Sequence, residues 1–75
     1  MTPEVQVVVE ALRRYIDDNP HACDSLDGIA RWWLGGRFPR PRVEAAMAAL
    51  LEEGTVERVS ATDGRVRWRR RGAIQ

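Results

Sequence analysis

An Asp-Gly pair at positions 63–64 separates two runs of residues in which apolar and polar side chains alternate. Asp-Gly is a strong signal for a tight β turn, because the turn needs positive φ angles that glycine adopts without steric cost. The alternation has the period of two that is typical of a half-buried strand. The sequence therefore predicts a β hairpin with strands at about 55–60 and 65–70.

Three segments with helical periodicity precede the hairpin. Apolar residues recur in each of them at spacings of three and four, which places them on one stripe of an α-helix. The predicted helices cover about 3–18, 25–34 and 41–53, and glycine or proline follows each helix as a stop signal. A chain of 75 residues is long enough for one hydrophobic core. We therefore expect residues 1–75 to form a single α+β domain, with three helices followed by a two-stranded hairpin.

Single residues can be assigned to the ends and the interior of these helices. Thr2 is the expected N-cap of the first helix, and Asp24 or Ser25 is the expected N-cap of the second. Gly28 lies inside the second helix, where glycine costs about 1 kcal/mol relative to alanine. We expect the close approach of a neighbouring helix to explain it. The expected core comprises Val5, Val8, Val9, Leu12, Ile16, Leu26, Ile29, Ala30, Trp33, Leu34, Val43, Met47, Leu50, Leu51, Val66 and Trp68.

Trp32 and Trp33 are neighbours, so their side chains point about 100° apart on a helix. Trp33 is expected in the core, which leaves Trp32 at the surface. There Trp32 either covers the edge of the core or anchors a protein partner, since exposed tryptophan is a frequent hot-spot residue of interfaces.

Charge is distributed unevenly along the chain. Residues 1–30 contain two arginines and six acids, a net charge of −4, whereas residues 31–75 contain ten arginines and five acids, a net charge of +5. All twelve basic residues are arginine. The planar guanidinium suits phosphates and base edges, although an arginine-only inventory is also typical of a GC-rich genome. A nucleic-acid footprint is therefore expected in the second half of the chain.

Three helices followed by an Asp-Gly hairpin resemble the winged helix-turn-helix superfamily. Residues 47–58 (MAALLEEGTVER) are similar to the end of that family's recognition helix as it runs into the first wing strand. Residues 63–65 (DGR) resemble the wing tip of the multiple-antibiotic-resistance type of repressor, and residues 24–34 resemble a segment of small bacterial proteins. The resemblance covers about 3–70 and implies a winged-helix fold, in which the hairpin is the wing.

The resemblance also implies a function. In DNA-binding members of the superfamily the third helix enters the major groove and the wing touches the backbone or the minor groove. A small cytoplasmic transcriptional regulator that binds double-stranded DNA as a homodimer is therefore the leading hypothesis. The residues implied to contact DNA are Arg37, Arg40 and Arg42 near the start of the third helix, and Arg65, Arg67 and Arg69 on the wing.

The third helix and the hairpin each allow a role other than DNA binding. The exposed face of the third helix carries small and acidic side chains, which neither read bases nor attract phosphate. The alternative function is a winged-helix module that docks on another protein through Trp32, Phe38, Ala45 and Ala48. The hairpin arginines form either a phosphate-binding strip or a charged strand edge that only protects against aggregation; they are Arg65, Arg67, Arg69, Arg70 and Arg71. Glu57 is expected to pair with one of them across the hairpin.

Catalytic and metal sites are not expected. His21 and Cys23 are the only histidine and cysteine, whereas a structural zinc site takes four ligands and a catalytic thiol needs an oriented base. Cys23 is expected as a buried structural thiol, and its solitary state fits a reducing cytoplasm. We expect no enzymatic activity, no cofactor and no membrane span, because no apolar run is long enough to cross a bilayer.

Overall fold

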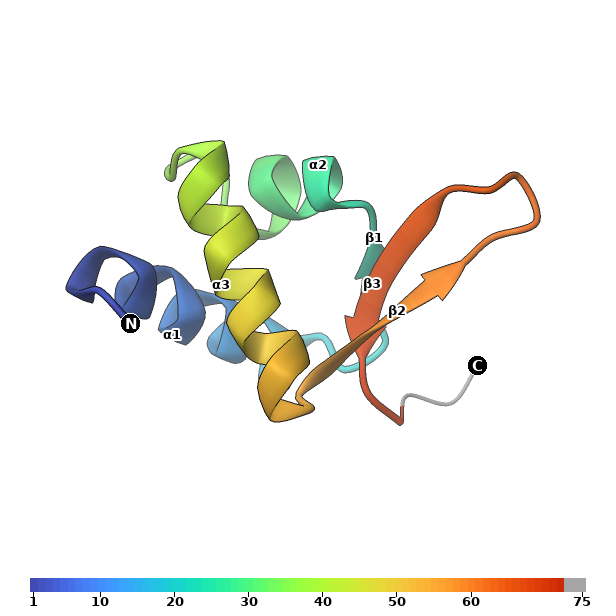
Figure 1. Ribbon diagram of the computed structural model, residues 1–75, viewed down its shortest axis with the longest axis horizontal. Coiled ribbons are helices and arrows are strands. Elements are labelled where there is room, and N and C mark those ends of the chain that lie inside the picture. Colours follow the sequence, from blue (N-terminus) through green and yellow to red (C-terminus); the bar gives the residue numbers. More distant parts are fainter. Residues whose placement is uncertain (73–75) are drawn as a thin grey trace.

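The computed structural model describes residues 1–72 and has an α+β architecture, as the sequence predicts (Figure 1). Three helical segments are followed by a hairpin that extends away from them (Figure 1). The order of elements is α1 (Pro3–Asp18), β1 (Cys23–Asp24), α2 (Leu26–Gly28), η1 (Ile29–Trp33), α3 (Arg40–Glu53), β2 (Val56–Ser60) and β3 (Val66–Arg70).

The sheet has three antiparallel strands rather than the two expected. β1 pairs with β3, so that the strand order is β1-β3-β2 and β3 is the central strand. Cys23 lies opposite Arg69, and Asp24 lies opposite Trp68. A strand of two residues is too short to show an alternating pattern, so the sequence carries no signal for it. Cys23 is exposed, and the prediction that its thiol is buried is wrong.

Both helix N-caps form as predicted, and Ser25 rather than Asp24 is the N-cap of the second helix. Thr2 Oγ1 accepts a hydrogen bond from Val5 N at 3.3 Å, and Ser25 Oγ accepts one from Gly28 N at 3.1 Å. The prediction for Gly28 is wrong, because Asp24 and not a helix approaches it. A Cβ atom at position 28 would lie 2.0 Å from Asp24 Oδ1. Glycine therefore makes room for the carboxylate of the preceding strand.

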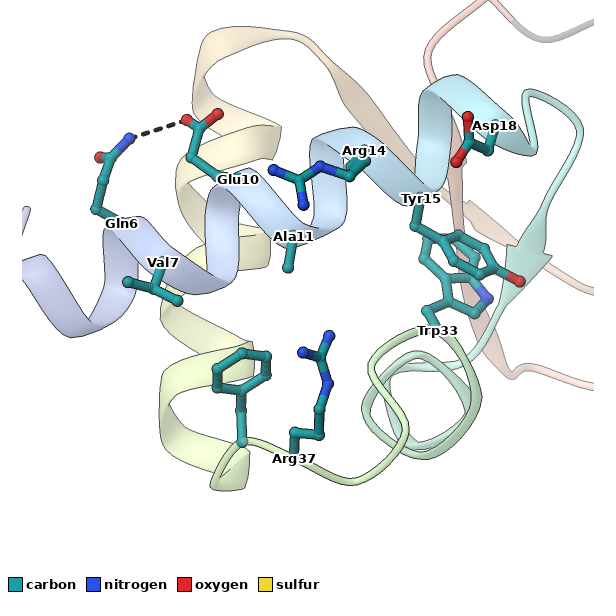
Figure 2. A pocket seen from close by; sticks show the side chains of 10 residues that line it. Gln6, Val7, Glu10, Ala11, Arg14, Tyr15, Asp18, Trp33 and Arg37 are labelled. Atoms are coloured by element: carbon teal, nitrogen blue, oxygen red, sulfur yellow. Dashed lines mark hydrogen bonds between the residues drawn. The ribbon is translucent and has the colours of Figure 1, made fainter.

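The expected second α-helix is only partly α-helical. After the short α2, the chain widens into the π-helix η1, in which Leu34 N donates to Ile29 O at 3.1 Å. Trp33 is buried, as predicted, and its ring stacks on Tyr15 of α1 with the centroids 4.9 Å apart and an interplanar angle of 13° (Figure 2). Trp32 is 70% exposed, so the interpretation that it covers the core edge is wrong.

The core lies where α1, η1 and α3 meet and where β2 begins. Most of the predicted interior residues are buried, and Ala46 and Val56 join them. Leu51 and Trp68 are half-buried, and Trp68 packs against the core from β3. Val66 is 44% exposed, contrary to the prediction, because the hairpin projects beyond the helices that could cover it (Figure 1). The buried cluster comprises Val8, Val9, Leu12, Ile16, Ile29, Trp33, Leu34, Val43, Ala46, Met47, Leu50 and Val56.

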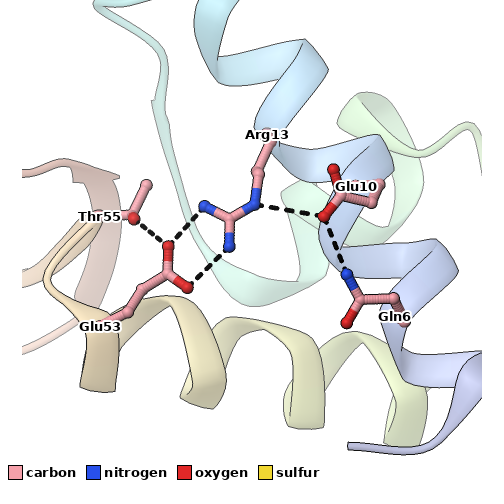
Figure 3. Close-up of polar contacts among 5 residues, drawn as sticks. All are labelled: Gln6, Glu10, Arg13, Glu53 and Thr55. Atoms are coloured by element: carbon pink, nitrogen blue, oxygen red, sulfur yellow. Dashed lines mark hydrogen bonds and ion pairs between the residues drawn. The ribbon is translucent and has the colours of Figure 1, made fainter.

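A polar cluster connects α1 with the junction between α3 and β2 (Figure 3). The Arg13 guanidinium donates to both carboxylate oxygens of Glu53, with Nη2 2.7 Å from Oε1. Thr55 donates its hydroxyl to the same carboxylate, and Glu10 accepts from Arg13 Nε at 3.4 Å. The hydrogen bonds from Arg13, then that from Thr55, lower the pKa of Glu53 from its ordinary 4.5 to about 2.

This carboxylate makes a predictable contribution to acid stability. Because the pKa of Glu53 is lowered by folding, its stabilising effect is complete above about pH 4.5 and is lost as the pH falls towards 2. The urea midpoint of the parent protein should therefore fall further between about pH 5 and about pH 2 than that of Glu53→Gln. Glu52→Gln, one residue away and exposed, serves as control and should fall like the parent. Equal acid sensitivity of Glu53→Gln and the parent would contradict the assignment.

Candidate functional site

Positive charge is concentrated on the hairpin. Residues 55–72 contain six arginines and two acids, a net charge of +4, whereas residues 1–54 contain six arginines and nine acids, a net charge of −3. The hairpin extends from one end of the molecule (Figure 1). Its charge is therefore presented to the surroundings apart from the acidic helices.

Strand register assigns the hairpin arginines to faces. Residues paired across antiparallel strands share a face, so Arg67 lies beside Val59 and Arg69 beside Glu57 on the face away from the core. Arg65 continues this row, because Ala61 N donates to Arg65 O at 2.8 Å just beyond the strands. The alternation puts successive arginines of the row about 7 Å apart. The structure thus brings the three predicted wing residues together.

The three arginines differ in how their charge is compensated. Arg69 Nε donates to Glu57 Oε2 at 2.7 Å, which confirms the expected cross-hairpin pair, and both side chains are largely covered. Arg65 is 80% exposed and lies 3.7 Å from Asp63 in a loose pair. Within residues 1–72, Arg67 forms no ion pair. Arg65 and Arg67 are therefore the members most available to an anionic partner.

The row also has basic neighbours, and of these the sequence interpretation did not single out Arg58. Arg58 of β2 lies on the opposite face of the hairpin, with its Cζ 5.7 Å from the centre of the Trp68 ring. Arg70 and Arg71 follow directly and are exposed. The alternation that identified Arg65 and Arg67 could also have placed Arg58, had it been applied to the first strand of the hairpin as well as to the second.

The arginines near α3 are arranged differently. Arg40 binds Asp27 Oδ1 at 2.7 Å and approaches Glu44 at 3.6 Å. Arg37 donates its Nε to Leu34 O at 2.9 Å. Arg42 is exposed, and no carboxylate of the described residues pairs with it. Within residues 1–72, Arg42 alone of the three has neither an ion pair nor a side-chain hydrogen bond.

These arginines lie at or just before the beginning of α3, whereas the hairpin follows from the other end of this helix (Figure 1). The solvent-facing side of α3 between these ends is small and acidic, as its spacing predicts. Its exposed residues are Glu44, Ala45, Ala48 and Glu52. Arginines therefore stand at both ends of a helix whose middle offers no group suited to reading bases.

The residues proposed for a protein interface come from three different segments of the chain. Trp32 projects from η1, and Arg31 Cζ lies 5.9 Å from its ring centre. Phe38 is half-buried and lines a groove beside α1, while Ala45 and Ala48 are exposed on α3. Trp32 is the one member of this group that presents a large apolar surface.

Other classes of site have little support in the described part of the chain. Among residues 1–72, no three His, Cys, Asp or Glu side chains gather closely enough to hold a metal ion. None of the helices in this range has the length and apolar character needed to cross a bilayer. Comparison of the chain with protein-family models, curated proteins and solved structures finds no match.

Proposed function

We propose that this chain is a winged-helix protein that binds double-stranded DNA, mainly through the exposed face of its hairpin. The observation that carries the proposal is the separation of charge, +4 on residues 55–72 against −3 on residues 1–54. A charged, projecting hairpin that follows three helices also supports the winged-helix assignment (Figure 1). Lys and Arg contacts to phosphate supply nearly all of the non-specific affinity of a protein for duplex DNA.

The proposed contacts are made to the DNA backbone more than to base edges. Arg65 and Arg67 present guanidinium groups from the hairpin, and Arg42 adds one at the start of α3. Some of the cations on one copy are already engaged, because Arg40 and Arg69 are held by carboxylates. A homodimer doubles the number of phosphate contacts, and we propose that the protein acts in this form as a cytoplasmic transcriptional regulator.

Removal of the two hairpin cations tests this proposal. The double variant Arg65→Ala, Arg67→Ala should keep its fold, because both side chains are exposed. We expect its affinity to fall for every duplex and its log–log salt slope to become shallower by about two, since each phosphate contact contributes about 0.9. Binding can be followed by fluorescence anisotropy of a labelled duplex at several salt concentrations.

A matched double variant removes the same charge from the helices. Arg14→Ala, Arg31→Ala changes two exposed arginines outside the hairpin and should leave the salt slope close to that of the parent. Equal losses in the two double variants would reject the hairpin as the contact surface. Failure of micromolar parent protein to bind any duplex at about 50 mM salt would reject DNA binding altogether.

The 70% exposure of Trp32 favours a second candidate function, docking on another protein. An exposed tryptophan beside an arginine is typical of interface hot spots, and its burial by a partner depends little on salt. Trp32→Ala in the same assay tests whether this tryptophan contributes to DNA binding. Under the DNA proposal the variant should bind duplexes like the parent, so a loss as large as that of the hairpin variant would favour a different surface.

A further inference from the structure

A groove lies between α1 and the connector that joins η1 to α3 (Figure 2). Its volume is about 510 Å³, within the range of about 300–1,000 Å³ that is typical of small-molecule sites. The groove is not part of the hairpin and has no role in the proposed DNA contact. Its lining residues include Val7, Ala11, Arg14, Tyr15, Trp33, Arg37 and Phe38.

Arg37 is held in position at the connector side of the groove. Gly35 and Gly36 have φ angles of 64° and 70°, which turn the chain back after η1. The Nε group of Arg37 then donates to Leu34 O at 2.9 Å, and its Cζ lies 5.1 Å from the centre of the Phe38 ring. The hydrogen bond engages Nε alone, so the terminal nitrogens of the guanidinium group can still donate. Figure 2 shows this group pointing toward α1.

Arg14 supplies a second cation from the α1 side of the same groove (Figure 2). Within residues 1–72, neither Arg14 nor Arg37 forms an ion pair. Two acids also line the groove. Glu10 is engaged by Gln6 at 2.9 Å and by Arg13, and Figure 2 shows it directed toward Gln6 rather than toward Arg37. Asp18 lies beyond Tyr15 along α1.

Apolar and aromatic surface surrounds the two cations. Val7 is 57% exposed at one side, with Ala11 and Phe38 beside it in the groove. The stacked rings of Tyr15 and Trp33 form the opposite end (Figure 2). Exposed apolar side chains next to rigid aromatic rings gain stability when a flat apolar body covers them.

We propose that this groove binds a small organic carboxylate with a flat apolar body. A carboxylate accepts two parallel hydrogen bonds from a guanidinium fork, and the Leu34 and Phe38 contacts hold the Arg37 fork ready for it. The apolar body lies against the surface formed by Ala11 and Phe38. This binding is independent of the DNA proposal, because the groove and the hairpin are made by different elements.

Phenylacetate is a suitable probe, and phenylacetamide is its neutral counterpart of nearly equal shape. In a titration followed by amide NMR spectra of the full chain, phenylacetate should cause saturable shifts grouped around Ala11, Arg37 and Phe38. Phenylacetamide should bind at least about tenfold more weakly, since charged hydrogen bonds are about twice as strong as neutral ones. Shifts that are scattered, that fail to saturate, or that are equal for the two compounds would overturn the proposal.

Two charge-removing variants locate the site. Arg37→Gln should weaken phenylacetate binding at least about tenfold and bring its affinity close to that of phenylacetamide. Arg31→Gln removes an exposed arginine that does not line the groove, and it should bind phenylacetate like the parent. Amide signals that stay unchanged away from the substituted residue will show that each variant is folded. Equal affinities of Arg37→Gln and Arg31→Gln for phenylacetate would assign binding to another surface.

Discussion

Leu50→Ala is expected to lower the free energy of unfolding by about 2–5 kcal/mol. Leu50 is fully buried on α3, within the cluster that joins this helix to α1. Its removal forfeits the transfer free energy of the side chain and leaves a cavity that the neighbouring helices can only partly close. A domain of this size has a total stability of about 4–11 kcal/mol, so this loss is a large share of it.

Urea denaturation measures this effect directly, and the melting temperature should fall by about 10 °C or more. Leu51→Ala is the matched control, because the same side chain at the next position of α3 is only half-buried. Its loss of stability should be clearly smaller. If Leu51→Ala were as destabilising as Leu50→Ala, the orientation of α3 described here would be wrong.

Trp33→Ala is expected to cost about 3–5 kcal/mol, which makes it the second large loss. Trp33 fills the space between η1 and α1, and its stacking on Tyr15 adds about 0.5–1.5 kcal/mol beyond the burial of area. Trp33→Phe keeps a ring opposite Tyr15 and should lose less. Circular dichroism is the appropriate signal for denaturation, because the substitution removes a tryptophan fluorophore.

The neighbouring tryptophan provides the control for this prediction. Trp32→Ala removes an identical side chain from a position that is 70% exposed, and it should change stability by no more than about 0.5 kcal/mol. Similar losses of stability at positions 32 and 33 would show that the side chains of η1 do not point in the directions described above. The comparison therefore tests the direction of both rings with one pair of variants.

The main elements of the fold were predictable because their signals are local. The stripe of α1, the cap at Thr2 and the turn at Gly64 each depend on residues a few positions apart. β1 and η1 were not predictable in this way. β1 exists because β3 pairs with it across more than forty residues, and the π-helix differs from an α-helix only in which carbonyl group accepts the hydrogen bond.

The sequence predicts which face of the hairpin carries the arginines, but it does not predict every ion pair that engages the candidate arginines. Alternation along β3 correctly put Arg67 and Arg69 on one face, and the expected pair with Glu57 formed. The pair between Arg40 and Asp27 was not foreseen, because it depends on where η1 sets α3 relative to α2. Likewise, the groove beside Arg37 results from how two helical segments pack, and no single segment encodes it.

The central position of β3 has a consequence for protein synthesis. β1 and β2 each pair only with β3 in the described sheet, and Trp68 on β3 packs against the core. The three helical segments are translated before any of this cover exists. We therefore expect the newly made chain to stay incompletely folded, and open to chaperones, until residue 70 has left the exit tunnel.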